Sequence, residues 1–290
     1  MKNNALADDF WLHNLPSSHA DYLSYTVIEL GRHPSAFLVY QNQQKFIKQV
    51  PEHIQKIEYS ILSWLEELQL DSNPSVSKTS ISKQRPTELQ LPKPDALTSR
   101  SDLLITSKLD GTQLTKSSLI SRFPLVCKIL VYLHQLVEVT KLPSIIVYSL
   151  DYELPISSDD VEGCYLELFN QAKINIADNI SIIGFIHGDL SMGNILVTET
   201  SIGIVDWEYA NVRDCRWDLA TIAVEFELNS DEFNNLCDVY LKQKGLQEDN
   251  FIDVAKSWAV IYAITCLSWA KKNNQQTNRY MQFLTRLVKN

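Results

Sequence analysis

Glycine and proline are scarce in this chain of 290 residues, and they are unevenly spread. There are only eight glycines, and all ten prolines fall at or before Pro155. Because proline fixes φ and removes an N–H donor, the second half of the chain has little to interrupt long helices. The shift in composition predicts two lobes, of which the second is mostly helical.

An excess of positive charge and a cysteine motif are also lacking. Lys and Arg total 26 against 35 Asp and Glu, and the net charge of −9 argues against a nucleic-acid partner. The cysteines number five, are widely spaced and form no C-x-x-C pair, which excludes a disulfide framework and a zinc site. Buried thiols in a reducing compartment are the expectation for Cys127, Cys164, Cys215, Cys237 and Cys266.

Long hydrophobic runs are absent too. Residues 1–13 carry Asp8 and Asp9 and no apolar run, which is unlike a signal peptide. The longest apolar stretch, Trp258 to Ala270, covers 13 residues, and as a helix it would rise roughly 20 Å, short of a hydrocarbon layer of about 30 Å. We therefore expect a soluble, cytoplasmic protein with no membrane partner; its oligomeric state is left open.

The N-terminal part has the pattern of a small antiparallel sheet followed by a helix. Tyr25–Leu30 and Ala36–Tyr40 are rich in β-branched and aromatic residues and flank the turn Gly31–Ser35. Lys45–Val50 predicts a third strand. Pro51 then opens a helical pattern with apolar residues at three- and four-residue intervals.

Two further segments complete this lobe. From Asp71 to Gln90 the chain is rich in Ser, Thr, Pro and Lys, which predicts an exposed or mobile insertion. Asp102–Leu109 is another predicted strand, and the turn signal Asp110-Gly111 follows it. We expect an N-terminal lobe over residues 1–109 and a C-terminal lobe over residues 110–290, together an α+β fold.

The C-terminal lobe contains a predicted central helix and one segment with recognisable chemistry. Pro124–Val137 is apolar nearly all round, so we expect it to be buried, with His134 as a core residue. Further along, Ile195–Thr198 and Ile202–Val205 predict a β-hairpin.

Three oxygen-bearing side chains lie at the edges of this hairpin. Asp189 and Asn194 precede or begin it with the spacing Asp-x4-Asn, and Asp206 follows Asn194 by twelve residues. Each alone fits a turn, where Asp and Asn bond nearby backbone. Together they fit phosphoryl transfer, which needs a carboxylate for the hydroxyl proton and oxygen ligands for Mg²⁺.

Three motifs extend this pattern: HGDLSMGNIL from His187, IVDWEYA around Asp206, and WDLA around Asp218. In this order they resemble the catalytic region of the aminoglycoside phosphotransferase and choline kinase superfamily, whose fold is similar to that of eukaryotic protein kinases. The sequence DWEY resembles most that of the choline, ethanolamine and thiamine kinase branch. The strong resemblance covers His187–Glu225, and a weaker one extends from Tyr25 to the C-terminus.

The resemblance implies a role for each matched residue. Asp189 would be the catalytic base, with His187 as a support for its loop. Asn194 and Asp206 would hold Mg²⁺, and Asp218 would accept backbone bonds beneath the catalytic loop.

In the small lobe the resemblance implies a site for ATP. Lys48 matches the cation that contacts the phosphates, and Glu58 matches its ion-pair partner; a surface lysine and a solvated glutamate are the alternative. The turn Gly31–Ser35 would cover the phosphates, but it has one glycine where protein kinases have several. A non-catalytic, nucleotide-binding pseudokinase is therefore an alternative.

The resemblance also implies a pocket for a small cationic substrate that carries a hydroxyl group. Tyr209 and Glu225 align with positions that line the choline pocket of choline kinases. Trp258, Tyr262 and Trp269 share a helix face by their four- and seven-residue spacing, although core packing explains such a stripe equally well. Cations bind to aromatic faces, so we expect a choline, ethanolamine or thiamine type of substrate, with an aminoglycoside as the alternative.

Overall fold

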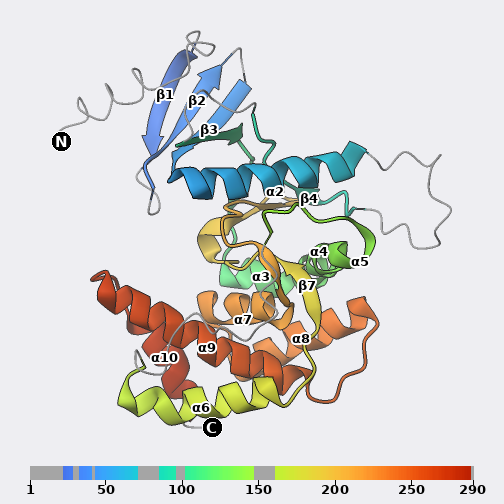
Figure 1. Cartoon of the computed structure of the whole chain (residues 1–290), viewed down its shortest axis with the longest axis vertical. Coiled ribbons are helices and arrows are strands. Elements are labelled where there is room, and N and C mark those ends of the chain that lie inside the picture. Colours follow the sequence, from blue (N-terminus) through green and yellow to red (C-terminus); the bar gives the residue numbers. More distant parts are fainter. Residues whose placement is uncertain are drawn as a thin grey trace.

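The structure is a computed structural model that describes residues 22–28, 33–40, 43–70, 85–95, 102–146 and 161–288. It has a small lobe built on a β-sheet and a larger lobe built on helices, joined beneath the long helix α2 (Figure 1). This arrangement confirms the predicted α+β fold class. Gly31, residues 1–13 and residues 71–84 lie outside the described residues.

The small lobe is an antiparallel sheet of four strands in the order β1-β2-β3-β5. Its strands are β1 (Tyr22–Ile28), β2 (Ser35–Tyr40), β3 (Gln43–Gln49) and β5 (Leu103–Ser107). All four fall within one to three residues of the predicted ranges. Lys48 and Ser35 are directly opposite each other on β3 and β2, so the register places both at one end of the sheet.

Helix α2 (Glu52–Leu70) starts directly after Pro51. Proline suits this place because the first helical N–H groups have no partner inside the helix. The apolar face predicted from the sequence is buried, with Ile61, Leu62 and Leu65 at most 2% exposed. Glu58 lies on the same buried side at 3% exposed, which turns its carboxylate toward β3 and Lys48.

A second sheet joins the two lobes. Its order is β4-β9-β8-β6, formed by β4 (Leu89–Gln90), β6 (Thr112–Gln113), β8 (Ile195–Val197) and β9 (Ile202–Ile204). The predicted hairpin is therefore present as β8 and β9. The prediction of an exposed or mobile insertion over Asp71–Gln90 is wrong at its C-terminal end, because Leu89 is 3% exposed and pairs in parallel with Ile202. Short strands of this kind form through long-range pairing, which local composition does not reveal.

The large lobe consists of helices around a two-stranded ladder of β7 (Ile183–Ile186) and β10 (Asn211–Asp214). The helices are α3 (Lys116–Ser121), α4 (Phe123–His134), α5 (Leu136–Val139), α6 (Gly163–Ala177), α7 (Arg216–Glu225), α8 (Ser230–Lys244), α9 (Phe251–Lys272) and α10 (Asn278–Val288). The helix predicted over Pro124–Val137 is interrupted at Gln135, so it appears as α4 and α5.

Helix α9 is the core of this lobe. It is long and apolar enough to cross a membrane by length and composition, yet 67% of its most apolar window is buried inside the protein. It packs against α6, α7 and α10. Its apolar character is thus explained by burial among neighbouring helices.

Candidate active site

The loop after β7 brings His187 and Asp189 to the junction of the lobes. His187 is fully buried, and its Nε2–H donates to the carbonyl oxygen of Val205 at 3.0 Å. Its Nδ1 accepts from the backbone N–H of Asp189 at 3.3 Å. Burial lowers the pKa of His187, so the neutral ring bridges the Asp189 loop and the segment before Asp206.

Asp218 of α7 holds the same loop from below. Its carboxylate accepts from the backbone N–H groups of His187 at 3.0 Å and Gly188 at 2.9 Å, and from Nε2 of His134 at 3.1 Å. Gly188 has φ of 86°, and a Cβ there would lie 2.4 Å from the carbonyl oxygen of Tyr209. The loop therefore needs glycine at this position.

Asp189 is partly enclosed and bound to Asn194. The Nδ2 of Asn194 donates to the backbone oxygen of Asp189 at 2.9 Å and to its Oδ2 at 3.0 Å. Burial, followed by the negative charges of Glu225 and Asp206, raises the pKa of Asp189 to about 7. A carboxylate with such a pKa is suited to general base chemistry near neutral pH.

Asp206 lies after β9 in a strained backbone conformation. Its φ is 67°, in the left-handed region that residues with a side chain seldom adopt and that is often found at functional sites. The N–H of Val205 donates to the carbonyl oxygen of Asn194 at 3.0 Å, which holds the two oxygen-bearing segments together. The side chain of Asp206 is 34% exposed, so it remains accessible from the cleft.

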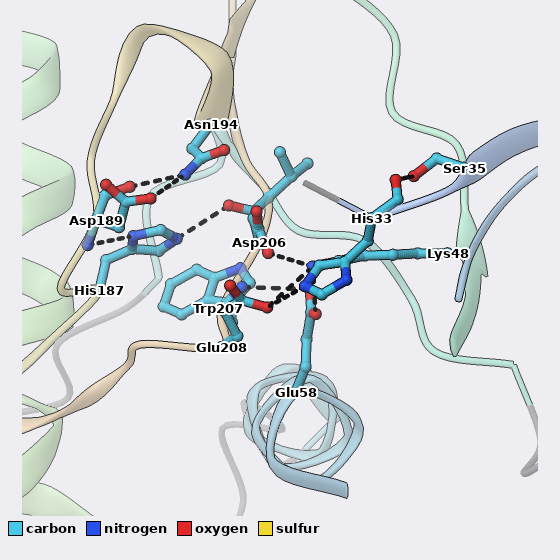
Figure 2. Close-up of polar contacts among 11 residues, drawn as sticks. His33, Ser35, Lys48, Glu58, His187, Asp189, Asn194, Asp206, Trp207 and Glu208 are labelled. Carbon is cyan, nitrogen blue, oxygen red and sulfur yellow. Dashed lines mark hydrogen bonds and ion pairs between the residues drawn. The ribbon is translucent and has the colours of Figure 1, made fainter. Parts of the chain in front are cut away.

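Lys48 reaches across the cleft to Asp206. Its Nζ lies 2.5 Å from Oδ1 of Asp206 and 3.3 Å from carboxylate oxygens of both Glu58 and Glu208 (Figure 2). Burial by itself lowers the pKa of Lys48, but the three carboxylates outweigh it and raise that pKa. The ammonium group is thus held permanently charged beside Asp206.

Glu58 is fixed from two sides. One oxygen faces Lys48, and the other accepts from the backbone N–H of Trp207 at 3.2 Å. Burial raises the pKa of Glu58 to about 7, although the charge of Lys48 opposes this. The contact with Trp207 connects α2 of the small lobe to the segment that carries Asp206.

Glu208 is a site residue that the sequence reasoning missed. Carboxylate oxygens of Glu58, Asp206 and Glu208 all lie within 4.8 Å of one another. The signal in the sequence was the glutamate in DWEY, two residues after Asp206. That motif was interpreted only as a mark of the branch of the superfamily. The three carboxylates form a strongly acidic cluster around Lys48.

A cavity of about 330 Å³ opens between the lobes beside this cluster. One part of its wall is apolar, with Phe37 and Phe46 from the sheet and Leu196 from the hairpin. The other end is polar and contains Lys48, Asn194, Asp206 and Ser35. Such a cavity suits a ligand with an aromatic part and a polar part.

On the other side of Asp189 lies Glu225 at the end of α7. Tyr262 of α9 lies between the two carboxylates, with its hydroxyl 3.4 Å from Oδ1 of Asp189 and 3.2 Å from Oε1 of Glu225. Arg279 and Tyr280 of α10 also bind Glu225, at 2.8 Å and 3.2 Å. The carboxylate of Glu225 is only 6% exposed and already has an internal cation as a partner.

The remaining residues expected in a substrate pocket are scattered. Tyr209 is 45% exposed and its backbone lies against Gly188, next to Asp189. Trp258 is 2% exposed and packs against Trp217 with ring centroids 5.5 Å apart, so its place is the core. Trp269 is 43% exposed, about two turns beyond Tyr262 on α9. The side chains on this helix face therefore lie in different environments. The one that contacts Asp189 is Tyr262.

Solved structures with the same fold support this assignment of the lobes. The choline kinase LicA from Streptococcus pneumoniae matches with a TM-score of 0.68 and 16% identity, over 99% of this chain and 100% of that one. A choline/ethanolamine kinase family protein from Mesorhizobium loti matches with a TM-score of 0.67 and 15% identity, over 97% of this chain and 93% of that one. The amicoumacin kinase hAmiN, in complex with AMP-PNP, Ca²⁺ and Ami, matches with a TM-score of 0.66 and 11% identity, over 99% of this chain and 92% of that one.

Comparison of the sequence itself gives the family. No protein in the curated set matches this chain. The model of the phosphotransferase enzyme family matches residues 25–245, which include the motifs around His187, Asp206 and Asp218 but not helices α9 and α10. The chain therefore belongs to the phosphotransferase enzyme family.

Proposed function

We propose that this enzyme transfers the terminal phosphoryl group of ATP, with Mg²⁺, to the hydroxyl of a small cationic metabolite. The observation that carries the proposal is the meeting of Lys48, Asn194 and Asp206 at the polar end of one cavity between the lobes, with the Asp189 carboxylate bound to Asn194 beside it. Two of these residues follow β7, one follows β9 and one comes from β3. Phosphoryl transfer needs this set, since catalysis consists mainly of positioning and charge neutralisation.

The nucleotide fits the cavity described above. Its apolar wall of Phe37, Phe46 and Leu196 suits a purine base, and its polar end suits phosphates. Two structures of similar fold contain nucleotides, LicA with AMP and amicoumacin kinase with AMP-PNP, which supports the same use here.

The residues that would hold Mg²⁺ are Asn194 and Asp206. Mg²⁺ prefers oxygen ligands and retains several waters, so two protein ligands are sufficient. Asn194 donates its Nδ2 to Asp189, which leaves the amide oxygen on the other side, and Asp206 keeps an accessible carboxylate. When bound, Mg²⁺ would neutralise charge on the phosphates.

Asp189 would take the proton of the substrate hydroxyl. As the hydroxyl oxygen forms its bond to the terminal phosphorus, the bond from that phosphorus to the bridging oxygen breaks and ADP leaves. The bond from Asn194 orients the Asp189 carboxylate, while Lys48, held by Glu58, would contact the phosphates.

The acceptor side supports a cationic substrate of the choline, ethanolamine or thiamine type. Glu225 and Asp189 supply negative charge, and Tyr262 places its hydroxyl between them. Arg279 already neutralises Glu225, so the ammonium group of a substrate would compete with this arginine. An aminoglycoside is the alternative, since several amines would also suit an acidic site. All five cysteines are free, which supports a cytoplasmic location.

The test is a panel of thiamine, choline, ethanolamine and kanamycin, each incubated with Mg-ATP and purified protein while ADP release is measured. We expect release that depends on one of these substrates and disappears in Asp189→Asn. If the protein binds ATP but releases no ADP with any substrate of the panel, nor with other amino alcohols, the pseudokinase would be favoured instead.

A further inference from the structure

Residues 33–35, the described part of the turn between β1 and β2 and its junction with β2, offer few backbone donors to a phosphate. Pro34 has no N–H, and its carbonyl oxygen accepts from the backbone N–H of Gln49 at 2.9 Å. The hydroxyl of Ser35 donates to the carbonyl oxygen of His33 at 3.0 Å, so its hydrogen is directed back into the turn. Within the described part, residues 33–35, the backbone can therefore offer two N–H groups at most.

The side chain of His33 lies where such donors are needed. It lines the cavity together with Lys48, Asp206 and Glu208. Its Nε2 lies 3.9 Å from Oε2 of Glu208, and the side chain is 15% exposed. Figure 2 shows the imidazole directed toward the acidic cluster, beside the end of Lys48.

We propose that His33 is a phosphate-binding residue, which adds an imidazole N–H to the few backbone donors of residues 33–35. This inference rests on the proposed function, because it requires a nucleotide with its phosphates at the polar end of the cavity. Nε2 of the imidazole lies 3.9 Å from Oε2 of Glu208 at this end of the cavity. The phosphates of ATP or ADP contact the imidazole when the nucleotide binds, and His33 and Lys48 then approach them from the turn before β2 and from β3.

The chemistry of this contact predicts which ligands are affected. A hydrogen bond to a charged group contributes more than a neutral one, so His33 discriminates by the number of phosphates. Adenosine fills only the apolar part of the cavity and does not reach His33. ADP and ATP reach it, and they bind more weakly when the imidazole is removed.

The experiment measures dissociation constants for adenosine, ADP and Mg-ATP by isothermal titration calorimetry, without an acceptor substrate. In His33→Ala we expect ADP and Mg-ATP to bind about 10- to 100-fold more weakly, with adenosine changed less than about twofold. His33→Asn, which keeps an N–H donor, should recover part of the loss, while His33→Phe, which keeps only a ring, should not. His53→Ala on the exposed face of α2 is the matched control and should bind all three ligands like wild type.

Two results would overturn the inference. Equal weakening of adenosine, ADP and Mg-ATP would show that His33 merely shapes the turn, and unchanged ADP and Mg-ATP binding would show that it does not touch phosphate. The thermal midpoint of each variant separates unfolding from weak binding, and His33→Asn and His33→Phe decide the matter if His33→Ala unfolds. A wild-type protein that binds none of the three ligands would instead contradict the proposed function itself.

Discussion

The two sides of Asp189 are built on different principles. On the proposed nucleotide side, the carboxylates of Glu58, Asp206 and Glu208 surround the single ammonium group of Lys48. This cluster of four side chains therefore carries a net negative charge. On the acceptor side, Glu225 is closed by Arg279, Tyr262 and Tyr280. The comparison teaches that the carboxylates on the first side come mainly from one short motif, whereas the environment of Glu225 depends on how α9 and α10 pack.

The largest expected effect is at the boundary between the two sides. Asp189→Asn keeps the shape of the side chain but cannot accept the hydroxyl proton, so kcat should fall by about 10³-fold, while the dissociation constant of Mg-ATP should change less than about threefold. Steady-state kinetics with the best substrate of the panel and calorimetry with Mg-ATP check this. Asp249→Asn, an exposed substitution, is the control; an active Asp189→Asn enzyme would refute the assigned base.

The next largest effect is on the nucleotide side. Asp206→Asn removes the accessible charge that would hold Mg²⁺, so we expect Mg-ATP to bind at least about tenfold more weakly, a change of roughly 1.4 kcal/mol. Removing Mg²⁺ with EDTA should have the same effect on wild type and little further effect on Asp206→Asn. Equal Mg-ATP affinity in both proteins would contradict the role of Asp206.

Removing the internal cation should show how strongly the acidic cluster depends on it. Lys48→Met leaves Glu58 and Glu208 without their buried partner, and breaking such a pair lowers the free energy of unfolding by about 3 kcal/mol. Chemical denaturation of the free protein measures this change. Lys56→Met is the matched control, because its pair with Glu52 is on the surface of α2 with the lysine side chain 58% exposed and contributes at most about 1 kcal/mol. Equal stability of the two variants would show that the Lys48 contacts contribute little.

The smallest effect is expected on the acceptor side. Arg279→Gln removes the cation that competes for Glu225, so KM for a cationic substrate should fall by about fivefold, the scale of a partly exposed ion pair of about 1 kcal/mol. The measurement is KM for the acceptor, with KM for ATP as an internal reference. Arg286→Gln, an exposed substitution further along α10, is the control, and a raised KM in Arg279→Gln would show that the arginine belongs to the pocket.

The same comparison explains how much could be predicted from the sequence. Asp189, Asn194 and Asp206 flank a hairpin whose strands were evident from β-branched runs, so their proximity followed from local pattern. Lys48 and Glu58 were proposed from the family resemblance, and the structure shows them as a buried ion pair. Glu208 lies in the same DWEY motif, but the motif alone did not identify it as a site residue, because an acidic residue after a strand is equally typical of a turn.

The acceptor side depends on tertiary packing, which periodicity does not determine. Trp258 and Tyr262 are one turn apart on α9, yet Trp258 packs against Trp217 while the hydroxyl of Tyr262 lies between Asp189 and Glu225. Arg279 reaches Glu225 because α10 folds back against α7 and α9. The two-residue strands β4 and β6 likewise form through pairing with β9 and β8 across long sequence separations.

A crystal structure of the protein with Mg²⁺ and AMP-PNP tests the central claim most directly. The account predicts one Mg²⁺ bound by the amide oxygen of Asn194 and the carboxylate of Asp206, with Lys48 on the phosphates and the carboxylate of Asp189 facing the terminal phosphorus. A nucleotide bound elsewhere, or phosphates that point away from Asp189 and Asp206, would contradict it.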